Sequence, residues 1–172
     1  MKTKPNLNIM NYDEIKKAAD HIEYVDLGLS VKWGNCNLGG EVPEDTGHRF
    51  TFEEKGEVDF VKLPTKEQCE ELINNCTWKW RGGKHQGCYV TGKNGNTIFL
   101  PAVGEMDYKG KMYAEGEGCS FWSSSFQGND GKYCYYLSFI HQFQFFGFKW
   151  ELKQSVPFTR GAGVVLVIRP VK

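Results

Sequence analysis

The sequence of 172 residues predicts a single α+β domain, with its helices early and most of its sheet late. Two segments in the first half repeat apolar residues at the spacing of one helix face. From residue 119 onward this spacing disappears, and β-branched or aromatic runs alternate with glycine or polar residues. We therefore expect two helices and a mostly antiparallel, twisted sheet.

A short amphipathic helix is expected over residues 12–21. Asn11, followed three residues later by Glu14, has the form of a helix start. Apolar residues then recur at i, i+3, i+4 and i+7, which gives the helix one apolar face. These residues are Ile15, Ala18, Ala19 and Ile22. The face is compatible both with packing on the domain and with self-association.

The chain then leaves the helical pattern. Residues 24–33 contain β-branched and aromatic residues, which predicts two short strands separated by a turn at Gly28. Residues 39–59 are rich in Gly, Glu and Asp and show little periodicity. They are expected to form a long surface loop with at most a short strand at residues 49–52.

The second helix is expected over residues 66–75. Thr65 supplies a cap and Gln68 stands at the third helical position, and apolar residues follow at helical spacing. These are Cys69, Leu72, Ile73 and Cys76. After this helix, residues 88–91 and 97–100 flank an Asn-Gly pair, which predicts a β-hairpin.

The later strands are rich in aromatic residues. They are expected over residues 121–125, 133–139, 142–150 and 164–171, with the last one apolar enough for the middle of a sheet. Alternation would place Phe139, His141, Phe143 and Phe145 on one face and Ile140, Gln142, Gln144 and Phe146 on the other. Twelve aromatic residues fall within residues 121–150. Large rings beside amide side chains are typical of binding surfaces, although an aromatic core explains them equally simply.

The order of several motifs resembles a known family. The motifs are Tyr24-Val25-Asp26-Leu27-Gly28-Leu29-Ser30-Val31-Lys32-Trp33 with Cys36-Asn37, Leu63-Pro64-Thr65-Lys66, Glu70-Glu71-Leu72, Asn74-Asn75-Cys76-Thr77-Trp78, Gly92-Lys93-Asn94-Gly95-Asn96-Thr97-Ile98-Phe99-Leu100-Pro101-Ala102, Trp122-Ser123-Ser124-Ser125 and Ile168-Arg169-Pro170-Val171. In this order they resemble the Fibrobacter succinogenes-type major paralogous domain of Bacteroidetes. The resemblance covers about residues 24–172.

The resemblance implies a C-type-lectin-like fold over residues 24–172, preceded by a helical extension over residues 1–23. Domains of this kind are similar to the variable proteins of diversity-generating retroelements. In such proteins the displayed residues lie between a Trp-Ser-Ser segment and an Arg-containing last strand. That region corresponds here to about Ser125 to Phe158. Trp33, Trp78, Trp80 and Trp122 fall in or near the motifs and are expected in the core, with their N–H groups hydrogen-bonded locally.

The charge balance and the apolar runs of the sequence indicate which classes of binding partner are expected. The 21 Lys and Arg residues balance the 21 Asp and Glu residues, so nothing predicts a nucleic-acid partner. The longest purely apolar run, residues 164–168, is far too short to span a bilayer, so direct membrane insertion is not expected. Residues 1–10 show no secretory signal, which leaves a cytoplasmic location or, if a signal was trimmed, a secreted or cell-surface one.

Motifs for catalysis, cofactors and metals are weak, and we expect none of these. Pro43-Glu44-Asp45 and Gly128-Asn129-Asp130 fall short of a calcium-dependent sugar site, and the four histidines are scattered. The three serines after Trp122 are better explained by hydrogen bonding at a strand end than by nucleophilic chemistry. The six cysteines are expected as mostly buried free thiols, with a disulfide framework as the alternative. Cys119 and Cys134 are the only residues on which a catalytic function could be based, as a cysteine pair.

The sequence therefore predicts a non-catalytic module that binds an unknown protein or glycan, in an oligomeric state that the sequence leaves open. The alternative is a structural or pilus-tip assembly domain whose aromatic segment is buried. The candidate ligand-binding residues are Ser125, Phe126, Gln127, Asn129, Tyr133, Tyr135, His141, Gln142, Gln144, Phe146, Trp150 and Phe158.

Overall fold

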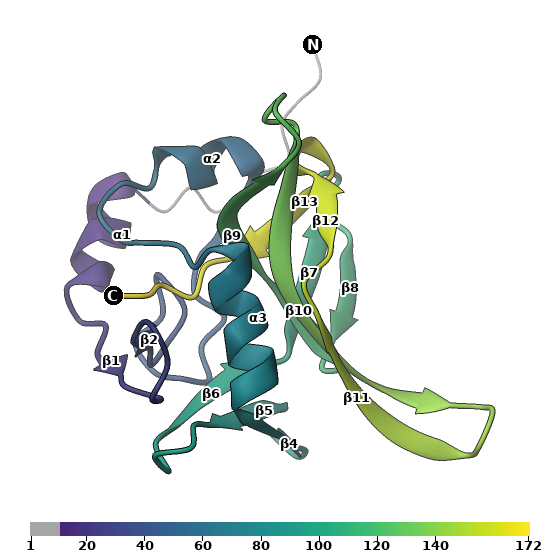
Figure 1. The fold of residues 1–172 in the computed structure, drawn as a ribbon. Helices are drawn as coiled ribbons and strands as arrows, with labels where there is room; N and C mark the ends of the chain where they lie inside the picture. Colours follow the sequence, from purple (N-terminus) through teal and green to yellow (C-terminus); the bar gives the residue numbers. More distant parts are fainter. Residues whose placement is uncertain (1–10) are drawn as a thin grey trace.

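The first helix forms where a polar side chain caps it. The computed structural model describes residues 11–172 (Figure 1). Helix α1 spans Tyr12–Ala19, and the side-chain oxygen of Asn11 accepts a hydrogen bond from the backbone N–H of Asp13. The helix ends earlier than expected because the N–H groups of residues 20–22 bond to carbonyls three residues back instead of four.

A second helix, α2, lies where a loop was expected, so residues 11–172 contain three α-helices and not two. It spans Phe52–Glu57. The Thr51 hydroxyl accepts from the N–H of Glu54, and the Glu54 carboxylate accepts from the N–H of Thr51. This reciprocal pair is a capping box, and it starts a helix too short for a recognisable apolar period.

Helix α3 spans Lys66–Asn75, the range that the sequence predicts. Thr65 and Gln68 form its capping box through hydrogen bonds of 3.2 and 2.9 Å. Cys69 and Leu72 on its inner face are fully buried. The prediction for Cys76 was only partly right, because this residue lies just past the helix end and is half-buried.

The strands of the described part of the chain form three sheets. A two-stranded sheet pairs β1 (Tyr24–Val25) with β2 (Trp33–Gly34), on either side of the expected turn at Gly28. A three-stranded sheet has the order β4 (Thr77–Arg81), β5 (Gly87–Thr91), β6 (Thr97–Pro101), and its second hairpin is the predicted one. The main sheet contains β3 (Arg49–Phe50), β7 (Val103–Asp107), β8 (Met112–Glu115), β9 (Gly118–Gln127), β10 (Tyr133–Gln144), β11 (Lys149–Ser155), β12 (Phe158–Arg160) and β13 (Val164–Val167). A short 3-10 turn, η1 (Gly161–Gly163), precedes β13.

The main sheet has the order β11-β10-β9-β13-β7-β8, and most of its pairs are antiparallel. The two strands expected over residues 133–139 and 142–150 are wrong, because β10 continues without interruption to Gln144. The reversal comes after it, where Gly147 and Phe148 both have positive φ angles. The last strand lies in the middle of the sheet as predicted, but it ends at Val167 and not at residue 171.

The core consists of two apolar clusters. One lies between α3 and the sheet and contains Leu72, Phe121 and Phe139, and the other includes Trp122 with Ile15 and Ile22. The described part of the N-terminal extension, residues 11–23, thus packs on the rest of the domain. Within residues 11–172, no helix is both long and apolar enough to span a membrane.

Candidate ligand-binding surface

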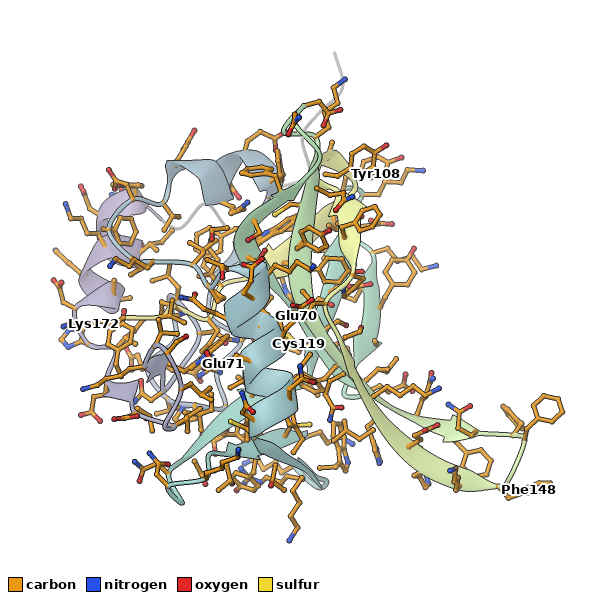
Figure 2. All side chains as sticks on the ribbon, in the orientation of Figure 1. Glu70, Glu71, Tyr108, Cys119, Phe148 and Lys172 are labelled. Carbon is orange, nitrogen blue, oxygen red and sulfur yellow. The ribbon has the colours of Figure 1, made fainter. Side chains whose placement is uncertain are left out.

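Strand β10 carries the candidate surface from one end of the molecule to the other. At its start it forms a hairpin with β9, and at its end it forms a second hairpin with β11 that projects away from the body (Figure 1). We call residues 141–153 of this second hairpin the tongue. Phe148 lies at its outer end (Figure 2). The tongue is held by strand pairing, which continues through Phe143 opposite Trp150 to Gln144 opposite Lys149.

The tip of the tongue exposes large aromatic rings to solvent. Phe145 is 79% exposed, Phe146 98%, Phe148 84% and Trp150 62%. Phe148 also has a φ angle of 49°, a conformation that side chains other than glycine rarely adopt. A contiguous group of exposed rings is unusual on a protein that stays alone in water, and such patches mark interaction sites.

A stack of three rings lies between the base of the tongue and the three-stranded sheet. The His141 ring lies between Trp80, with centroids 4.3 Å apart, and Trp150, with centroids 5.0 Å apart, and both pairs are nearly parallel. Burial lowers the pKa of His141. The same rings, with Gln86, Glu115, Gly116 and Glu117, line a cavity of about 480 Å³. Trp80 was expected in the core, but it is half-buried and forms part of this cavity wall.

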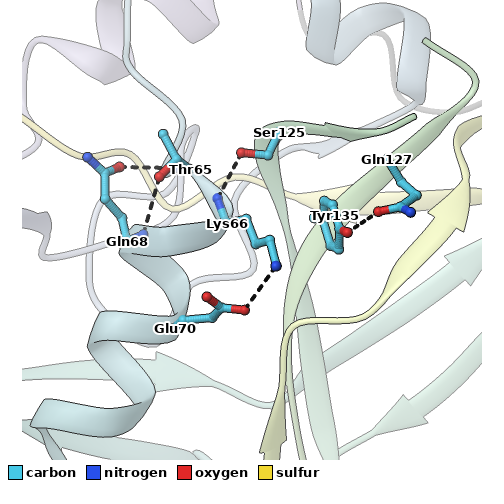
Figure 3. Close-up of polar contacts among 7 residues, drawn as sticks. All are labelled: Thr65, Lys66, Gln68, Glu70, Ser125, Gln127 and Tyr135. Atoms are coloured by element: carbon cyan, nitrogen blue, oxygen red, sulfur yellow. Dashed lines mark hydrogen bonds and ion pairs between the residues drawn. The ribbon is translucent and has the colours of Figure 1, made fainter. Parts of the chain in front are cut away.

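The other end of β10 carries a second aromatic group. The Phe158 ring packs edge-on against Tyr133 and Tyr135, at centroid distances of 6.3 and 5.7 Å. The Tyr135 hydroxyl donates a hydrogen bond to the side-chain carbonyl of Gln127 (Figure 3). The Lys66 ammonium lies 5.1 Å from the centre of the Tyr135 ring and 3.4 Å from a Glu70 oxygen.

Some candidate residues have clear structural roles. The Ser125 hydroxyl accepts a hydrogen bond of 2.9 Å from the backbone N–H of Lys66, so it helps to satisfy the start of α3 (Figure 3). The Ser123 hydroxyl donates to the Tyr135 carbonyl at 2.7 Å. The serine run therefore serves hydrogen bonding along β9, as the sequence indicates. Phe126 packs edge-on against Phe52 at 6.0 Å but remains exposed.

The predicted residues form two surfaces and not one. Residues Ser125, Phe126, Gln127, Asn129, Tyr133, Tyr135 and Phe158 belong to the β9–β10 end. Residues His141, Gln142, Gln144, Phe146 and Trp150 belong to the tongue. Strand β10 has 12 residues, so its ends lie roughly 36 Å apart at the rise of an extended strand. Phe139, His141 and Phe143 share one face of β10 as predicted, and this face runs from the core at Phe139 to the solvent at Phe143. Phe145 was expected on the same face, but it lies in the turn after the strand.

The candidate residues predicted from the sequence do not include several aromatic residues in or against the tongue. Phe143, Phe145 and Phe148 are exposed, and Trp80 joins the ring stack. The run Phe145-Phe146-Gly147-Phe148 contained the signal, because a glycine inside an aromatic run can mark the reversal of a hairpin.

Two carboxylates of the Pro43-Glu44-Asp45 motif have structural roles. Glu44 pairs with Arg81 at 3.1 Å, and the Asp45 carboxylate accepts hydrogen bonds from the N–H groups of Glu41 and Val42.

Among residues 11–172, no group of three or more His, Cys, Asp or Glu side chains could hold a metal ion. Five of the six cysteines are buried, as expected. Burial raises the pKa of Cys119 to about 12.

Comparisons of the chain with protein-family models, curated proteins and solved structures found no match. The candidate surface is therefore defined by its geometry and chemistry alone.

Proposed function

We propose that this protein is a non-catalytic ligand-binding module that presents an aromatic-rich surface on a C-type-lectin-like scaffold. The observation that carries the proposal is the exposure of Phe145, Phe146 and Phe148 at the end of a projecting hairpin. Covering one such ring contributes about 1.5–3 kcal/mol through removal of apolar surface from water. A partner that covers the tip therefore gains affinity from side chains that the fold itself does not use.

The scaffold around this segment supports a surface that can vary. Trp122 and Arg169, which flank the segment in sequence, are both fully buried. The Trp122 indole N–H donates to the Phe50 carbonyl, and the Arg169 guanidinium donates to the carbonyls of Gly34 and Phe99. Changes at exposed positions between them would leave these contacts intact. This arrangement agrees with a segment diversified as in the variable proteins of diversity-generating retroelements.

Deep sequencing of the 3′ end of the gene across its source population tests the diversified form. We expect substitutions at codons for exposed positions within residues 120–160, with Trp122 and Arg169 fixed. Codons for the buried residues Cys134, Leu137 and Phe139 should stay invariant or conservative. An invariant segment would leave a fixed module with a single ligand, and uniform variation over the whole gene would contradict the proposal.

Binding itself is tested on arrays of purified glycans and of purified surface proteins. Replacement of Tyr133, Gln144 and Trp150 together by alanine should abolish capture of any array component that the unchanged protein retains. Thermal unfolding of the two proteins should be nearly the same, since none of the three side chains is fully buried. A large drop in the melting temperature would instead identify these side chains as structural.

A second candidate function, assembly into a larger structure, is favoured by one observation. Strand β11 lies at the edge of the main sheet, so its outer backbone groups can pair with a strand of another chain. The solution mass from size exclusion with light scattering distinguishes the two functions. A monomer over a wide concentration range supports the ligand-binding module. An oligomer that the substitution Glu151→Pro disrupts supports assembly.

A further inference from the structure

A buried lysine beside the candidate ligand-binding segment has no carboxylate partner among residues 11–172. Lys55 is on α2 and is 6% exposed, although lysine is rarely buried unless it is paired. None of the ion pairs formed within residues 11–172 includes it. Its ammonium instead faces the rings of Phe52, Trp122 and Phe126, at 5.2, 5.6 and 4.6 Å from their centres.

The lysine ammonium donates a hydrogen bond to a cysteine sulfur. Lys55 Nζ lies 3.1 Å from Cys134 Sγ, and the Cys134 side chain is completely buried on β10. The carbonyl oxygens of Ser123, Ser125 and Tyr135 lie 3.2–3.4 Å from the same sulfur. These acceptors can take a thiol hydrogen, which leaves sulfur lone pairs available to face the nitrogen.

We propose that Lys55 and Cys134 form a redox-sensitive covalent site, in which dioxygen inserts one oxygen atom between Nζ and Sγ. The Lys55 ammonium first releases one proton to solvent. The resulting amine and the thiol together hold three hydrogens. The O–O bond breaks, one oxygen forms the N–O and O–S bonds, and the other leaves as water with two of these hydrogens. The third hydrogen stays on nitrogen. Dioxygen gains four electrons, which the nitrogen and sulfur centres supply.

The position of the pair supports this chemistry. Lys55 and Phe126 line a cavity of about 600 Å³. A small oxidant in this cavity would reach the Lys55–Cys134 pair from the lysine side. An oxygen bridge needs only a small approach of two atoms that are already 3.1 Å apart, whereas a direct S–N bond would need a larger one. Larger oxidants and thiol reagents are hindered, because the sulfur itself is buried.

The bridge would change both charge and rigidity at one end of the candidate surface. It would replace a charged ammonium by a much less basic nitrogen directly below the Phe126 ring. It would also tie α2 to the start of β10, between residues 79 positions apart in sequence. Tyr133 and Tyr135 flank Cys134, so oxidation would restrict the backbone that presents these two rings.

Mass spectrometry of the whole protein tests the proposal. In air-saturated buffer, the mass should increase by one oxygen atom and decrease by two hydrogen atoms relative to protein kept without oxygen. Dithiothreitol should reverse the change. Proteolytic mapping of the unchanged protein should give one cross-linked species that joins the peptides containing Lys55 and Cys134, and this readout does not depend on any variant folding.

Variants separate this site from general oxidation. The mass change should disappear in Lys55→Met and in Cys134→Ser. It should persist in Lys66→Met, which removes another lysine close to β10, and in Cys76→Ser, which removes the half-buried thiol. Two results would overturn the proposal: air-exposed protein with no cross-linked peptide, or a mass change that persists when Lys55 is replaced.

Discussion

Trp122 and Trp150 show how differently the same side chain is used at two positions. Trp122 is fully buried and its N–H donates a 2.9 Å hydrogen bond to Phe50, whereas Trp150 is mostly exposed. We expect Trp122→Phe to lower the free energy of unfolding by about 2–3 kcal/mol, through a lost hydrogen bond and a residual cavity. Trp150→Phe should change it by no more than about 0.5 kcal/mol. Urea unfolding at neutral pH measures both, and equal losses would contradict the assignment of Trp150 to the surface.

Two histidines link stability to pH. Burial lowers the pKa of His48 and of His141 below the ordinary value, and a nearby Glu54 only partly offsets the effect at His48. The unfolded chain therefore binds protons at these positions before the folded chain does. We expect the stability that these groups contribute to be fully present above about pH 6.5 and to be lost as the pH falls through their folded pKa values. Urea unfolding from pH 8 to pH 5 should show this loss, and His48→Gln with His141→Gln should reduce its slope.

At the scale of elements, the two capping boxes explain why short polar segments become helices. Thr65→Ala removes the hydroxyl that accepts the N–H of Gln68 at the start of α3. We expect a loss of about 1 kcal/mol in the free energy of unfolding. Thr77→Ala, at an exposed position on β4, is the matched control and should cost less than about 0.5 kcal/mol. Chemical denaturation measures both, and a similar loss in the two variants would argue against the capping role.

The aromatic side chains at the tip of the tongue contribute little to the stability of the fold. Replacement of Phe145, Phe146 and Phe148 together by serine should leave the melting temperature within a few degrees of the original, because the rings are exposed. Phe139→Ser on β10, the strand that leads into the tongue, should be strongly destabilising, by at least about 3 kcal/mol, because that ring is buried. An anilinonaphthalene sulfonate dye should bind the original protein more strongly than the tip variant. Equal dye fluorescence would show that the tip does not act as an apolar contact surface.

For the whole molecule, the separation of the two aromatic surfaces makes them energetically independent. Tyr133 and Trp150 occupy opposite ends of the β10 region, at a distance of the order of 30 Å for an extended strand. We expect the effects of Tyr133→Ala and Trp150→Ala on the free energy of unfolding to add within about 0.5 kcal/mol. Thermal or urea unfolding of both single variants and the double variant tests this. A larger coupling energy would mean that the strand transmits changes between the two surfaces.

The sequence by itself determined the features that depend on neighbouring residues. Thr65 and Gln68 fix the start of α3, and the Asn94-Gly95 pair fixes the hairpin of β5 and β6. The α+β class and the apolar last strand were predictable for the same reason, because periodicity and turn chemistry act over a few residues. The C-type-lectin-like fold and the diversified site stay predictions.

The tertiary structure alone decided what depends on partners distant in sequence. Residues 52–57 become a helix with the help of contacts between Phe52 and the rings of Trp122 and Phe126. Strand β10 continues past residue 139 because β11 pairs with it as far as Gln144, which moves the turn and divides one predicted surface into two. Lys55 and Cys134 meet only because α2 packs on the main sheet. Local patterns say which side chains share a face, but the register and the packing partner decide whether that face is core, contact surface or reactive site.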